Sequence, residues 1–203
     1  SFYRRQFSSI IDLFYGQYIS VVTCPECTAQ STTYTPECCF TLPIPARKDK
    51  NVPVDVTDCW RKFVEPEIMD KKNKYLCEKC NQRTCATKQI TLWKAPNILI
   101  ILLKRFTSDG HHSAKLNDMV TYPMVLDLTD FCTSYDRINA SYSLYSVCNH
   151  QGVTGGGHYF AYCKDFDGKW RIYNDSSVSD IAEKDVITRD AYCLFYRKIK
   201  ESN

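Results

Sequence analysis

The chain is poor in glycine and methionine, and it has no strong excess of charge of one sign. It has seven glycines, three methionines and a formal net charge of +3 over 203 residues. Without a long run of lysine or arginine, so small a charge argues against an arm that binds nucleic acid. No apolar stretch is long enough to span a membrane, since the strongest, Ile98 to Leu103, is short and β-branched. We also expect no signal peptide, because Ser1 to Arg5 runs straight into polar and basic residues.

Cysteine, by contrast, is abundant. Twelve cysteines fit either a secreted disulfide scaffold or an intracellular protein with metal-bound and free thiols. Disulfide scaffolds are usually small and rich in loops, whereas this chain has long strand-like segments and 44% hydrophobic residues. Four of the cysteines also fall in two CxxC pairs, which suits a metal better than two bridges. The composition therefore favours an intracellular protein, cytoplasmic or nuclear.

Strand patterns dominate the chain. Helical spacing of apolar residues is found only over residues 8–14 and 54–63, and Thr57 or Asp55 lies near the start of the second segment. Strands are predicted over residues 16–23, 30–34, 84–92, 98–106, 142–149, 158–164, 169–173 and 191–197. This pattern predicts an α+β fold with a mostly antiparallel sheet.

The two CxxC pairs indicate a metal site. Cys24-Pro25-Glu26-Cys27 and Cys77-Glu78-Lys79-Cys80 each form a tight turn that presents two thiolates. Two such turns supply the four sulfur ligands of a structural zinc ion, Zn²⁺. Forty-nine residues separate Cys27 from Cys77, so two distant hairpins must build the ribbon. The alternative is that one CxxC pair is a redox motif or that its cysteines are free thiols. Cys85 and the adjacent Cys38-Cys39 are assigned to no site.

The most informative segment surrounds His158. Four of the seven glycines lie between Gly152 and Gly157, and we expect them to form a mobile loop that places His158 at the start of a strand. A hairpin turn over residues 164–168 then returns the chain, which brings Asn174 beside His158. A thiol protease needs an imidazole base and an oxygen acceptor that orients it. The alternative is a surface histidine that caps a strand.

These residues resemble the histidine box of the ubiquitin-specific proteases. In that family a GHY tripeptide precedes a strand similar to Trp170–Asn174. Further motifs follow the family's order: LKRF at residues 103–106, Tyr122-Pro123, the segments 142–150 and 191–196, and the paired CxxC of the fingers. The resemblance covers essentially the whole chain, from Phe14 onward.

The resemblance implies a papain-like cysteine protease of the ubiquitin-specific protease type, with fingers over about residues 15–95 and a palm over about residues 96–203. His158 would be the general base, Asn174 would orient it and Asp175 could assist. The zinc ribbon of Cys24, Cys27, Cys77 and Cys80 would form the tip of the fingers that hold ubiquitin. The channel for the ubiquitin tail would be bordered by the loop 108–115 and by Gly155, Gly156, Gly157 and Tyr159. The reaction would be hydrolysis of an isopeptide or peptide bond after the terminal glycine of ubiquitin, and the partners would be ubiquitin and ubiquitinated proteins.

One family motif has no counterpart in these 203 residues. None of the twelve cysteines lies in a segment like the GNTCYxNS cysteine box, and no helical thumb precedes Phe14. We therefore expect the chain alone to be inactive, and the missing segment either lies upstream in the same protein, is supplied by another chain, or is absent. One alternative is a non-catalytic ubiquitin-binding or scaffolding module. Another is a zinc-ribbon nucleic-acid binder, against which Glu26, Glu78 and the small net charge argue.

Overall fold

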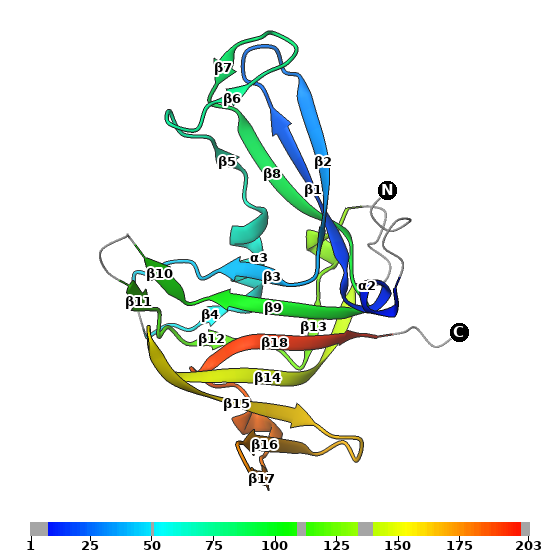
Figure 1. Ribbon diagram of the computed structural model, residues 1–203, viewed down its shortest axis with the longest axis vertical. Coiled ribbons are helices and arrows are strands. Elements are labelled where there is room, and N and C mark those ends of the chain that lie inside the picture. The colour runs from blue at the N-terminus through cyan, green and yellow to red at the C-terminus, as the bar shows by residue number, and fades with distance from the viewer. Residues whose placement is uncertain (1–7, 50, 109–112, 134–139, 200–203) are drawn as a thin grey trace.

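Two sheets make up the framework of the protein. The computed structural model describes residues 8–49, 51–108, 113–133 and 140–199. A narrow four-stranded sheet projects from a broad eight-stranded one, and small turns lie at its far end (Figure 1). The narrow sheet is antiparallel and has the order β2 (Gln30–Glu37), β1 (Gly16–Thr23), β8 (Thr87–Lys94) and β5 (Glu67–Ile68).

The broad sheet carries the C-terminal half of the chain. Its strands, in order, are β17 (Ser177–Asp180), β16 (Trp170–Asn174), β15 (Gly156–Lys164), β14 (Ser141–Val153), β18 (Ala191–Lys198), β9 (Ile98–Lys104) and β3 (Phe40–Pro43), and β13 (Val125–Asp127) also pairs with β14. Neighbours are antiparallel except β3, which runs parallel to β9. The predicted α+β fold with a mostly antiparallel sheet is confirmed. The division into fingers and palm at about residue 95 stays a prediction.

Three two-stranded ribbons and four short helices complete the described part. The ribbons are β10 (Phe106–Ser108) with β11 (Ser113–Lys115), β6 (Tyr75–Leu76) with β7 (Arg83–Thr84), and the parallel pair β4 (Val54–Asp55) and β12 (Val120–Thr121). The helices are α2 (Ser9–Phe14), α3 (Val56–Val64), η1 (Thr129–Phe131) and η3 (Glu183–Asp185). No helix among the described residues is long and apolar enough to cross a membrane.

Helix α3 begins two residues later than predicted. Asp55 is extended and caps the helix, its carboxylate accepting a hydrogen bond from the Thr57 amide at 2.8 Å. Val54 and Asp55 instead pair with β12. The helical spacing in the sequence was read correctly, but the cap residue belongs to a strand.

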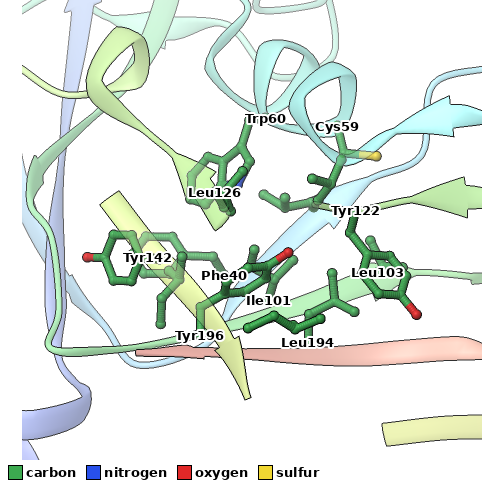
Figure 2. Packing of buried hydrophobic residues seen from close by; sticks show 14 of the residues in the cluster. Phe40, Cys59, Trp60, Ile101, Leu103, Tyr122, Leu126, Tyr142, Leu194 and Tyr196 are labelled. Atoms are coloured by element: carbon green, nitrogen blue, oxygen red, sulfur yellow. The ribbon is translucent and has the colours of Figure 1, made fainter. Parts of the chain in front are cut away.

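The main core lies between α3 and the broad sheet (Figure 2). Trp60 of α3 is fully buried, its ring centroid 5.5 Å from that of Phe40 and 6.0 Å from that of Phe131. Strands β9 and β18 contribute the buried residues Leu99, Ile101, Leu103, Leu194 and Tyr196. Each fully buried aliphatic side chain contributes about 1.5–3 kcal/mol. This core fixes the sheet whose next strands carry His158 and Asn174.

Candidate functional site

The glycine run forms a tight hairpin instead of the expected loop, whereas its mobility stays a prediction. Strands β14 and β15 pair up to Val153 and Gly156, so only Thr154 and Gly155 remain in the turn. Gly155 has φ 96° and Gly152 has φ 122°, conformations that side chains rarely adopt. His158 is therefore the third residue of β15, held in register opposite Gln151. The glycines were interpreted as a loop with a freely variable backbone, but they instead meet the backbone requirements of a hairpin.

The structure brings His158 and Asn174 into contact. His158 Nε2 lies 2.5 Å from Asn174 Oδ1, because the β15–β16 hairpin returns the chain as predicted. A carboxamide oxygen only accepts, so Nε2 carries the hydrogen and Nδ1 keeps its lone pair. The His158 ring stacks on Phe160 at 6.4 Å, and about half of its side chain is exposed. This contact fixes the tautomer of the neutral imidazole, and Nδ1 has no hydrogen-bond partner among the described residues.

Asp175 lies farther from the imidazole. Its Oδ2 is 4.0 Å from His158 Nε2, beyond hydrogen-bond distance, and its side chain is largely exposed. Its backbone is in the left-handed region, with φ 50°, which Asp tolerates better than most residues. The geometry therefore places Asn174 ahead of Asp175 as the orienting group.

An ion-pair cluster braces the strand that carries Asn174. Arg171 contacts the carboxylates of Asp165 and Asp167 in the turn and that of Asp180 on β17. The hydrogen bond from Arg171 lowers the pKa of Asp167. Tyr173 donates its hydroxyl to Asp165 at 2.9 Å. The sequence suggested the turn, but it gave no signal for this cluster.

The other predicted channel residues lie along the same hairpin. Gly155 and Gly156 have open space around them, whereas Gly157 packs against His150. Tyr159 is half-exposed, with its ring centroid 4.6 Å from that of His150. Burial, together with the nearby Lys115, lowers the pKa of His150. In the loop 108–115, positions 109–112 lie outside the described residues.

The four predicted metal ligands meet at one point. The sulfurs of Cys24, Cys27, Cys77 and Cys80 all lie within 4.8 Å of one another. The distances are 3.9 Å from Cys24 to Cys80 and 3.6 Å from Cys27 to Cys77. Zinc–sulfur bonds of about 2.3 Å in a tetrahedron require sulfurs about 3.8 Å apart. The donor set and its spacing fit a structural metal ion, and zinc is the metal that four thiolates favour.

The two knuckles share one backbone conformation. The amide four residues after the first cysteine bonds back to the carbonyl of that cysteine, Thr28 to Cys24 and Asn81 to Cys77. Thr28 and Asn81 both have positive φ, 57° and 54°. Burial raises the pKa of the Cys24 thiol, but hydrogen bonds from the amides of Cys27 and Glu26 and from the side chains of Thr84 and Cys27 together lower it to about 6. Amides that point at the sulfur favour the thiolate, the form that binds a metal.

The cysteines outside the candidate metal site are not hydrogen-bond partners of His158 among the described residues. All twelve belong to the described residues, and none of them forms a disulfide there. No hydrogen bond joins any of them to His158 among the described residues, where the side-chain partner of His158 is Asn174. Burial raises the pKa of Cys59, in the core helix α3, to about 12, which makes it a poor nucleophile.

A buried cation near the site was not recognised in the sequence. Arg105 follows β9, is fully buried, and donates to the carbonyl oxygens of Ala191 at 2.7 Å, Leu116 at 3.0 Å and Asp118 at 2.9 Å. It joins the start of β18 to the segment before β12. The sequence signal that could have indicated this burial was the position of Arg105 at the end of an apolar strand.

Comparison with known proteins gives consistent matches. A protein-family model described as ubiquitin carboxyl-terminal hydrolase matches residues 2–196. The chain is 40% identical over 202 residues to ubiquitin carboxyl-terminal hydrolase 2 of Gallus gallus, covering 98% of this chain and 56% of that protein. It is 36% identical over 200 residues to ubiquitin carboxyl-terminal hydrolase 21 of Homo sapiens, covering 98% of this chain and 35% of that protein. It thus spans between a third and somewhat over half of these relatives.

Solved structures match over nearly the whole chain. A chain of the yeast SAGA DUB module gives a TM-score of 0.84 at 31% identity, covering 98% of this chain and 44% of that one. A SAGA DUB module of Ubp8, Sgf11, Sus1 and Sgf73 bound to monoubiquitin gives a TM-score of 0.83 at 30% identity, covering 97% and 43%. The fold of this chain is therefore that of these chains.

Proposed function

Because the chain belongs to the ubiquitin carboxyl-terminal hydrolase family, we propose that it supplies the histidine half of the active site of a deubiquitinating thiol protease. The contact between His158 Nε2 and Asn174 Oδ1 is the observation that carries this proposal. It gives the imidazole the tautomer that a general base requires. The substrate is ubiquitin joined through its C-terminal glycine to a protein amine.

The reaction has two stages. His158 Nδ1 takes the proton of a cysteine thiol, and the thiolate attacks the carbonyl carbon of the terminal glycine. The imidazolium then gives that proton to the leaving amine as the carbon–nitrogen bond breaks, which leaves a thioester. In the second stage His158 deprotonates water, which hydrolyses the thioester and regenerates the thiol. Asn174 holds the ring throughout.

We place the nucleophile outside these 203 residues, in a segment of the same protein or in another chain. Support comes from the twelve cysteines, none of which is hydrogen-bonded to His158 in the described part of the chain. Four belong to the candidate metal site. The relatives extend well beyond the region matched here, so there is room for such a segment.

The narrow sheet and its zinc ribbon would hold the globular body of ubiquitin. Support comes from the likeness to the SAGA DUB module bound to monoubiquitin and from the projection of this sheet away from the body (Figure 1). The channel residues Gly155, Gly156, Gly157 and Tyr159 would border the path of the ubiquitin tail. Twelve described cysteines without a disulfide, four of them in a candidate metal site, suit a reducing compartment, so we place the protein in the cytoplasm or nucleus.

A second candidate is a ubiquitin-binding module without catalysis. The lack of a hydrogen bond from any described cysteine to His158 favours it. An oriented imidazole with a free nitrogen favours the enzyme, because a module that only binds has no need of it.

A ubiquitin probe with a C-terminal electrophile distinguishes the two candidates. We expect a covalent adduct with the full-length protein, detected by mass spectrometry, and none with the 203-residue chain. Replacing His158 by Ala in the full-length protein should slow labelling about a hundredfold or more, because proton transfer contributes about 10²–10⁴-fold. An unlabelled full-length protein would contradict the hydrolase and support the binding module. Labelling of the short chain would contradict our placement of the nucleophile.

A further inference from the structure

We propose that His150 is a positioning residue for His158, because the His150 ring packs directly against the Gly157 backbone. We call this ring the seat of Gly157. The inference rests on the proposed function, and it adds a second residue that sets the position of the His158 imidazole.

Gly157 is glycine because of space, not conformation. A Cβ at this position would lie 2.2 Å from His150 Nε2 and 2.8 Å from its Cε1, far inside the 3.0 Å limit of real contacts. It would also lie 2.5 Å from the carbonyl oxygen of Gln151. Gly157 does not have positive φ, unlike Gly152 and Gly155. At Gly156, one residue earlier, an added Cβ would meet nothing within 4 Å.

His150 provides a rigid seat. It is 4% exposed, and its ring contacts those of Phe106 at 5.5 Å, Tyr159 at 4.6 Å and Tyr192 at 6.2 Å. Its amide donates to the Asp190 carbonyl at 2.9 Å, and its carbonyl accepts from Lys115 Nζ at 2.5 Å. Nδ1 is buried and has no hydrogen-bond partner among the described residues. Packing therefore holds the ring, and its shape is what the neighbouring strand meets.

The seat acts on the next residue of the chain. Gly157 pairs with Gly152 and directly precedes His158, so a displaced Gly157 backbone moves the His158 imidazole. Asn174 does not follow that movement, because Arg171 braces its strand from the turn and from β17. The 2.5 Å contact between the two side chains would then lengthen. A misplacement of about 1 Å at a catalytic group can cost about a hundredfold in rate.

A double-variant cycle in the full-length, zinc-loaded protein tests this. Gly157→Ala should lower kcat for a ubiquitin substrate by about a hundredfold, with a smaller change in KM. His150→Ala alone should lower kcat by about tenfold or less, because the strand loses its seat but meets no obstruction. Adding His150→Ala to Gly157→Ala should restore kcat by about tenfold, since the methyl group enters the vacated space. Recovery is partial because the Gln151 carbonyl remains.

Gly156→Ala is the matched control. Whatever this variant costs, His150→Ala should not restore it, because no atom of His150 lies within 4 Å of the added methyl. A double variant no more active than Gly157→Ala would overturn the proposal. So would a Gly157→Ala variant that only raises KM, since Gly157 would then serve substrate access.

The same variants can also be tested by thermal unfolding, without a measurement of activity. If the wild-type full-length protein does not hydrolyse ubiquitin, the proposed function fails, and thermal unfolding of the same variants tests the seat alone. Gly157→Ala should lower Tm, or prevent folding, and His150→Ala should recover part of that loss. Strict additivity of the two changes in Tm would overturn the seat as well.

Discussion

Two neighbouring side chains, Asn174 and Asp175, are both polar candidates for orienting His158. Their distances from His158 Nε2, 2.5 Å and 4.0 Å, assign the role to Asn174. We expect Asn174→Ala to lower kcat of the full-length protein about ten- to a hundredfold more than Asp175→Ala does, because only the first removes the acceptor. Asn174→Asp keeps an oxygen and should retain more activity than Asn174→Ala. Equal losses in the two alanine variants, measured with a fluorogenic ubiquitin substrate, would show that the residues share the role.

Individual residues also show how much of the candidate sites could be predicted from the sequence. The knuckle cysteines and the His158–Asn174 contact were predicted, because each depends on local spacing and one hairpin return. The burial of His150 and of Arg105 was not predicted. Both depend on rings and carbonyl groups from distant strands, which no local pattern reveals.

His150 should make stability depend on pH. Burial and Lys115 lower its pKa in the folded state, so below its ordinary pKa of about 6.5 the unfolded chain binds a proton that the native state does not. The group therefore destabilises the fold as pH falls through about 6.5 toward its lower folded pKa. Urea unfolding at pH 7.5 and 5.5 should show a larger loss for wild type than for His150→Gln, which cannot titrate. Parallel losses would mean that His150 is not held neutral.

At the scale of elements, the fold depends on positions where a local pattern meets a tertiary requirement. Helix α3 was predicted from its apolar spacing, but its cap Asp55 lies in a strand that pairs with β12. The glycine run was interpreted as a loop, whereas strand pairing continues to Val153 and Gly156. In both cases the missing information is a partner strand, and partner strands are not visible from one segment.

The zinc ribbon should behave as a separable element. Its ribbon β6–β7 and the β1–β2 turn contribute no residue to the main core, so a metal bound by the four cysteines would be their principal support. Chelation, or Cys77→Ser, should speed amide exchange over residues 24–30 and 75–84 and leave β14 and β18 protected. In zinc-finger peptides such a site contributes an apparent ~10–16 kcal/mol. Mass spectrometry of hydrogen exchange would measure this, and Cys85→Ser, outside the four-sulfur cluster, is the matched control. Unchanged exchange in the knuckles would argue against a structural metal.

At the scale of the whole molecule, Arg105 joins segments that are far apart in sequence. Replacing it by Met leaves three carbonyl oxygens without their donor, those of Ala191, Leu116 and Asp118. An unsatisfied buried group costs about 1–3 kcal/mol, and only the bond to Ala191 is fully buried, so we expect Arg105→Met to lower the free energy of unfolding by roughly 2–5 kcal/mol. Lys104→Met is the control, because Lys104 is exposed and should change the free energy by about 0.5 kcal/mol or less. Urea denaturation at fixed zinc measures both. A loss as small as that of the control would mean that the sheet and the core hold β18 against the rest of the molecule without this cation.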